Sequence, residues 1–137
     1  MANSMYVPLT QLPEDLAAMS VIVEEVFREF GVTSPIAKFD TPGRDASFLR
    51  NFVLVEGQDP QARCWVSFSE CSTDISERAG YNNMADIQTR GAWNFAALVA
   101  YALCKYAGYV VRNDGGELDG QVTYSVASLR AVLLQRL

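Results

Sequence analysis

Apolar residues recur every three or four positions in three stretches of the chain, which is the spacing of a helix with one buried face. In residues 13–30 they form a single stripe, and Pro13 suits a first helical turn. Residues 93–107 hold almost no polar position, so this helix should be buried on most sides. Residues 126–136 follow Ser125, which is a favourable N-cap. We therefore expect three helices, with the middle one at the centre of the core.

Runs rich in β-forming residues lie between these helices. Residues 47–56 and 63–69 flank a Gly-Gln-Asp-Pro turn, which predicts a β-hairpin. Shorter extended segments are expected at 36–39, 109–112 and 121–124. Residues 70–90 show no clean period and indicate a long polar loop, part of it a short helix around 84–89. The predicted order is α-β-β-β-α-β-α. It describes one α+β domain over residues 1–137, with a mainly antiparallel sheet packed against a buried central helix.

Composition removes several classes of function. The 137 residues include no histidine, which excludes catalytic Ser-His-Asp triads, Cys-His pairs and histidine-ligated zinc. Phosphate-binding glycine motifs are also missing from the sequence. A net charge of −5 argues against binding to a nucleic-acid backbone. We expect no catalytic residues, no cofactor, no metal and no nucleic-acid partner.

The cysteines, the N-terminal residues and the length of the apolar runs together predict the cellular compartment. Cys64, Cys71 and Cys104 are odd in number and form no CxxC motif, so they are expected to be reduced structural thiols. The first twelve residues lack the pattern of a secretory signal. No apolar run reaches the ~20 residues needed to cross a bilayer. These features favour a soluble cytoplasmic protein without a membrane partner.

Negative charge is concentrated at the start of the chain. Residues 1–46 carry seven acids against three bases, while residues 47–90 carry six against four and residues 91–137 carry three against four. The first helix should therefore present an acidic outer face, with Glu14, Glu25 and Glu29 as candidate contacts for a basic partner.

Two further clusters are candidate sites. Long polar loops often carry function, so residues 70–90 supply four candidate partner contacts: Asp74, Glu77, Arg78 and Tyr81. Trp65 is either another interface anchor or part of the core. Asp114, Glu117 and Asp119 are candidate partner contacts too. They form either a small carboxylate site, which would suit an enzyme, or a solvated turn.

The segment NFAALVAYALCKYAGYVVRNDGGELDGQVTYSVASLRAVL joins a buried Ala-rich helix, a strand, an Asp/Gly turn and a Tyr-Ser step into a last helix. Over about residues 94–134 this resembles small acidic α+β proteins of bacterial toxin-immunity families. The resemblance implies a non-enzymatic protein that binds a cognate toxin or effector, a basic one given the acidic helix, and occludes its active site. The alternatives are a small carboxylate-dependent enzyme and a structural domain that self-associates, for example as a homodimer, through residues 70–90.

Overall fold

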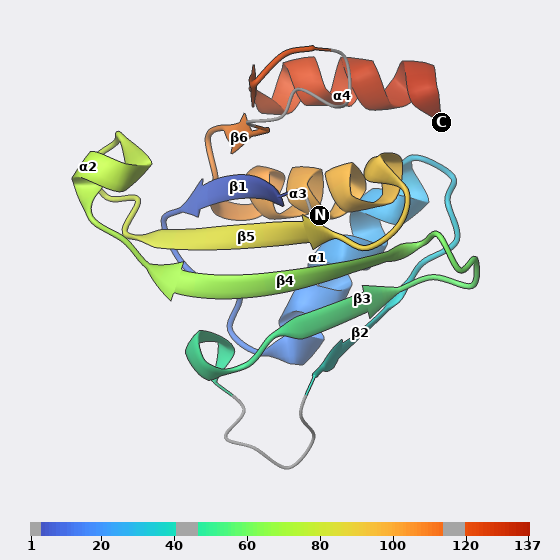
Figure 1. Cartoon of the computed structure of the whole chain (residues 1–137), viewed down its shortest axis with the longest axis horizontal. Coiled ribbons are helices and arrows are strands. Elements are labelled where there is room, and N and C mark those ends of the chain that lie inside the picture. Colours follow the sequence, from blue (N-terminus) through green and yellow to red (C-terminus); the bar gives the residue numbers. More distant parts are fainter. Residues whose placement is uncertain (1–3, 41–46, 114–119) are drawn as a thin grey trace.

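The computed structural model describes residues 4–40, 47–113 and 120–137. Within these ranges the chain forms helices and a seven-stranded antiparallel sheet, which is the predicted α+β class (Figure 1). The helices are α1 (Leu16–Glu29), α2 (Thr73–Ser76), α3 (Trp93–Ala107) and α4 (Val126–Arg136), with a 3-10 turn, η1, at Phe48–Arg50. The strands are β1 (Ser4–Leu9), β2 (Ile36–Phe39), β3 (Val53–Glu56), β4 (Arg63–Glu70), β5 (Asn83–Thr89), β6 (Val111–Arg112) and β7 (Thr123–Tyr124).

The first strand of the chain lies inside the sheet. The strand order is β2-β3-β4-β5-β1-β6-β7, and β1 pairs with β5 along its whole length. The sequence analysis did not predict β1. A proline inside a strand removes a ladder hydrogen bond. β1 accommodates Pro8 because its pairing with β6 is sparse, with Tyr6 opposite Arg112 and an isolated bridge at Leu9.

The prediction of a long loop over residues 70–90, with a short helix around 84–89, is wrong. Residues 83–89 are β5, which pairs with β4 on one side and β1 on the other. Its inward side chains, Ala85 and Ile87, are buried, while Asp86 and Gln88 point outward and are half-buried. Two inward residues, one of them alanine, give a weak alternating pattern. Pairing with neighbours on both sides therefore decides the structure of this segment.

Other predicted boundaries are also shifted, among them the starts of the strands expected at 109–112 and 121–124, which are β6 and β7. The helix expected over residues 13–30 begins only at Leu16, where the Asp15 side chain accepts a hydrogen bond of 2.7 Å from the Ala18 backbone N–H. The strand expected over residues 47–56 begins only at Val53, after the 3-10 turn. Phe48 in that turn is buried and lies edge-on to Phe68, with ring centroids 5.0 Å apart. This contact places the start of the turn in the core.

Helix α3 is the centre of the core, as predicted. Its ten residues from Phe95 to Cys104 are all buried. The sheet covers one side of it, and α1 and α4 pack along its flanks (Figure 1). Cys64 and Cys104 are buried free thiols, and burial raises the pKa of Cys104 to about 12. Both cysteines therefore pack as small apolar side chains.

One carboxylate connects the three long helices. Glu29 on α1 accepts a hydrogen bond of 2.9 Å from Lys105 Nζ on α3 and one of 3.0 Å from Arg130 Nε on α4. The hydrogen bonds from Lys105 and Arg130 lower the pKa of Glu29 below its usual 4.5. Because both of its oxygens are used, Glu29 serves the packing of the helices, not a free acidic surface.

We expect Glu29→Gln to lower the free energy of unfolding by about 0.5–1 kcal/mol at pH 7, the range for solvent-exposed ion pairs. Since the pKa of Glu29 is lowered in the folded state, its contribution is present above pH 4.5. It should be lost as the pH falls through the folded-state value. Urea unfolding of both proteins between pH 7 and pH 3 measures this. Glu25→Gln, an exposed position on the same helix, is the control and should change little. If the difference in the free energy of unfolding between the two proteins stayed constant over this pH range, the role of the ion pairs would be contradicted.

Candidate protein-binding site

Residues 71–82, which we call the α2 connection, join β4 to β5 and fold back over the end of the sheet. A backbone hydrogen bond of 2.8 Å from Cys71 N to Asn82 O closes the base of the connection. The connection contains α2 and reaches β6, which lies beyond β1 in the strand order. It is therefore an ordered structure held by distant residues.

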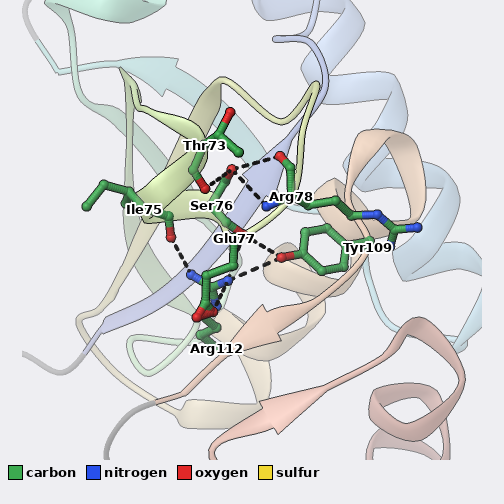
Figure 2. Close-up of polar contacts among 7 residues, drawn as sticks. All are labelled: Thr73, Ile75, Ser76, Glu77, Arg78, Tyr109 and Arg112. Carbon is green, nitrogen blue, oxygen red and sulfur yellow. Dashed lines mark hydrogen bonds and ion pairs between the residues drawn. The ribbon is translucent and has the colours of Figure 1, made fainter.

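Arg112 on β6 holds the end of α2 (Figure 2). Its guanidinium donates hydrogen bonds of 2.9 Å to Ile75 O and 2.8 Å to Ser76 O, and it pairs with Glu77 Oε2 at 3.0 Å. The Tyr109 hydroxyl also donates to Ser76 O. Carbonyls at a helix end have no partner within the helix, so these donors satisfy groups that would otherwise need water.

Two further features fix the chain after α2. The Ser76 hydroxyl is buried and donates a 3.0 Å hydrogen bond to Arg78 O. Glu77 adopts a left-handed backbone conformation, with φ of 65°, which costs a non-glycine residue of the order of 1 kcal/mol. It is the only non-glycine residue with positive φ in the described ranges. The ion pair with Arg112 is one contact that holds it there.

This arrangement presents an exposed arginine on two aromatic rings. The Arg78 guanidinium carbon lies 4.8 Å from the Tyr109 ring centroid and 5.7 Å from that of Tyr81. The two rings meet edge to face, 4.7 Å apart. Figure 2 shows the Arg78 side chain extending past the Tyr109 ring. We call these three residues the Arg78 stack. Arg78 makes no ion pair in the part of the chain that the structure describes.

Acidic residues are frequent in the segment of the chain that carries Arg78 and Tyr81. Residues 70–82 hold three acids, Glu70, Asp74 and Glu77, and one base, Arg78. Glu77 is paired with Arg112, whereas Glu70 and Asp74 are exposed and form no ion pair with another described residue. The segment therefore combines the Arg78 stack with two exposed carboxylates that no described cation pairs with.

The other predicted contacts lie elsewhere. Glu14 is exposed ahead of α1, and Glu25 lines a groove of ≈ 200 Å³ between α1 and α3 that Lys105 also lines. Glu29 is paired with Lys105 and Arg130, as described above. The predicted residues Asp114, Glu117 and Asp119 lie outside the described residues. Among the candidates that the structure describes, Asp74, Glu77, Arg78 and Tyr81 thus share one connection.

The sequence analysis missed Tyr109 and Arg112, which hold the α2 connection. Arg112 contacts residues 35–37 positions earlier in the chain. No local sequence motif predicts a contact between residues this far apart in the sequence. The only available signal was an arginine at the end of a short predicted strand. Arginines are common at exposed sheet edges, so this signal does not identify an anchoring residue.

The face of the sheet opposite the helices is a second feature near the connection. Helix α1 lies behind the sheet in Figure 1, so the side chains that point forward are uncovered by it. We call this the open sheet face; it includes Tyr6, Trp65, Ser67, Asp86 and Gln88. Trp65 therefore lies outside the core, half-buried, and its ring meets Phe52 edge to face with centroids 6.1 Å apart.

Neither a metal-binding cluster nor a membrane-spanning helix is found among the described residues. No group of three or more Cys, Asp or Glu side chains there is placed to hold a metal ion. None of the described helices combines the length and the apolar character needed to span a bilayer.

We expect Arg112→Met to release the α2 connection while the core remains folded. Losing the hydrogen bonds to Ile75 O and Ser76 O should lower the free energy of local opening of the connection by about 1.5 kcal/mol. The fraction of molecules in which the connection is open should then rise about tenfold. Limited trypsin digestion, with mass spectrometry of the products, should then show faster cleavage after Arg78. Arg63→Met, which removes one exposed ion pair with Glu56, is the control. Equal cleavage rates in the two variants would contradict the anchoring role of Arg112.

Comparison with known proteins gives no match at any level. No protein-family model matches the chain. Neither a curated protein nor a solved structure matches it either.

Proposed function

We propose that this chain is a non-enzymatic binding protein of the immunity type, which binds and occludes a basic cognate toxin or effector. The observation that carries the proposal is the Arg78 stack, an exposed arginine and two tyrosines displayed on a connection that the fold holds in place. Arginine and tyrosine are enriched among the few residues that dominate binding energy at protein interfaces.

Preorganisation supports this assignment. Ordering a loop during binding costs free energy, and a loop that is already ordered avoids that cost. The contacts of Arg112 and Tyr109 fix the backbone of residues 75–78 but leave the Arg78 guanidinium accessible. The stack has no described ion-pair partner within the chain, so a partner protein can supply one.

The charge around the stack favours a basic partner. Glu70 and Asp74 are exposed carboxylates in the same segment, and charges at the rim of an interface steer association more than they add affinity. The immunity role itself rests on the resemblance of residues 94–134. An interface of standard size would bury about 1,600 Å² in total, which is more than the connection alone can supply.

The direct test uses the product of the neighbouring gene. It is expressed alone and together with this chain, and growth is compared. The two purified proteins are then mixed and examined by size-exclusion chromatography and calorimetry. Protection and a defined complex are expected. Loss of growth in both cultures, with no complex formed, would refute the proposal.

We expect Arg78→Ala to weaken the complex at least tenfold, because it removes the cation of the stack and leaves both tyrosine rings partly uncovered. Calorimetric titration of the purified pair measures the dissociation constant. Arg28→Ala, an exposed arginine on α1, is the matched control and should leave the affinity unchanged. Equal affinities for the Arg78 variant and the parent protein would exclude the stack as the anchor.

Charge reversal separates the two acidic surfaces. Asp74→Lys should slow association with a basic partner by about threefold or more at low salt, and less at high salt. If the partner approaches the α2 connection, Glu25→Lys should slow association less than Asp74→Lys does. If the partner approaches α1, Glu25→Lys should slow association more. Stopped-flow association rates at two salt concentrations measure the difference. A dominant effect of Glu25→Lys would move the binding surface to the helix layer.

A further inference from the structure

The outer edge of β2 carries unpaired backbone groups. β2 is the first strand in the order of the sheet, and within the described ranges only β3 pairs with it. The Asp40 backbone N–H donates a 2.9 Å hydrogen bond to Phe52 O, so these two residues form a hydrogen-bonded pair. Such pairs alternate along antiparallel strands, and the N–H and C=O groups of Ala37 and Phe39 therefore point away from β3. An edge of this kind can pair with a further strand.

The exposed side chains along this edge carry opposite charges. Lys38 lies opposite Leu54 and thereby on the open sheet face, and Asp40, two residues later, points to the same face. Lys38 pairs with Glu56 at 3.4 Å, but its side chain is 62% exposed and its ammonium group has donors for a second acceptor. Asp40 is exposed and pairs with no cation in the part of the chain that the structure describes. The edge thus presents a cation and an unpaired anion side by side.

The outward residues of β2 allow three registers for pairing with β2 of a second copy. Two identical antiparallel strands related by a two-fold axis join their outward residues as hydrogen-bonded pairs. If Ala37 met Ala37, Phe39 would face Pro35, which has no N–H to donate. If Ala37 met Phe39, the two copies of Lys38 would lie opposite each other, and like charges there are destabilising. If Phe39 met Phe39, each Lys38 would lie opposite Asp40 of the other copy.

We propose that two copies of this chain associate through the outer edges of β2, with Phe39 at the two-fold axis and Lys38 of each copy opposite Asp40 of the other. The two Phe39 residues exchange a pair of backbone hydrogen bonds, and both neighbouring cross-strand pairs join opposite charges. The occupant of the edge is a second copy because the edge is complementary to itself. The cation that Asp40 lacks is supplied by an identical strand.

An exposed apolar side chain supports this use of the edge. Ile36 is 72% exposed, more than any other large apolar side chain in the described ranges, and it lies on the same face as Lys38. A strand added beside β2 would cover part of this side chain, which favours association. The contact is nevertheless small. Stable interfaces bury about 1,200–2,000 Å² in total, and two strands of four residues supply only part of that area, so we expect a weak dimer.

This inference does not depend on the proposed function. β2 and β6 lie near opposite ends of the strand order, and the α2 connection is anchored on β6 (Figure 1). A dimer formed through β2 therefore leaves the Arg78 stack accessible in both copies.

The test exchanges charges between copies. Sedimentation equilibrium at low salt, from about 10 µM to about 1 mM, should show a monomer–dimer equilibrium for the parent protein. Asp40→Lys makes both charged positions cationic and Lys38→Asp makes both anionic, so each variant alone should dimerise at least tenfold more weakly. An equimolar mixture of the two variants should associate like the parent, because opposite charges again meet at both positions. Glu14→Lys, which changes the net charge as Asp40→Lys does, is the control and should alter the dissociation constant less than twofold.

A second measurement tests the register on the unaltered chain. The Phe39 amide should exchange its hydrogen more slowly at about 1 mM than at about 50 µM protein, in proportion to the fraction of dimer. The Asp40 amide, already bonded to Phe52 O, should be protected at both concentrations. A parent protein that stays monomeric, a dimer that Asp40→Lys does not weaken, or variants that do not associate when mixed would each overturn the proposal. So would a Phe39 exchange rate that is independent of concentration.

Discussion

The fold depends on the need to cover helix α3 on every side. Ten consecutive buried residues leave it no face that can meet water, so a sheet and two further helices must pack around it. The C-terminal end of α3 is also closely packed. A Cβ atom on Gly108 would lie 2.9 Å from Cys104 Cα and 3.1 Å from Pro8 O, which shows how closely the helix end approaches β1. The burial of one helix thereby determines where β1 runs in the sheet.

This constraint also divides the molecule into two unlike surfaces. With α1 and α4 flanking α3, the helix layer is tied together on its outside by Glu29, Lys105 and Arg130. One face of the sheet is not covered by these helices. The α2 connection folds over the end of that sheet and is fixed by Arg112. Binding residues on a rigid scaffold need little reordering, so this side of the molecule is the better platform for a partner.

Elements with strong local signals could be predicted from the sequence. Helices α3 and α4 have the predicted bounds, because unbroken apolar periodicity and the Ser125 cap act within a few residues. Strands β1 and β5 could not be found in this way, since their stability comes from pairing with segments distant in sequence. The same holds for charge. Glu29 belongs to an acidic stretch in sequence but meets Lys105 and Arg130, 76 and 101 positions away. The partners of Arg112 are equally remote.

Costly features differ in meaning according to the surface on which they lie. Thr89 holds a buried hydroxyl without a partner among the described residues, but its position on β5 turns it toward the helix layer, where a partner protein cannot reach. Left-handed Glu77, by contrast, lies next to exposed Arg78 on the α2 connection. Proteins break local rules most often at functional sites and compensate for the cost elsewhere. For this reason the α2 connection, and not the acidic first helix, carries the argument for a partner.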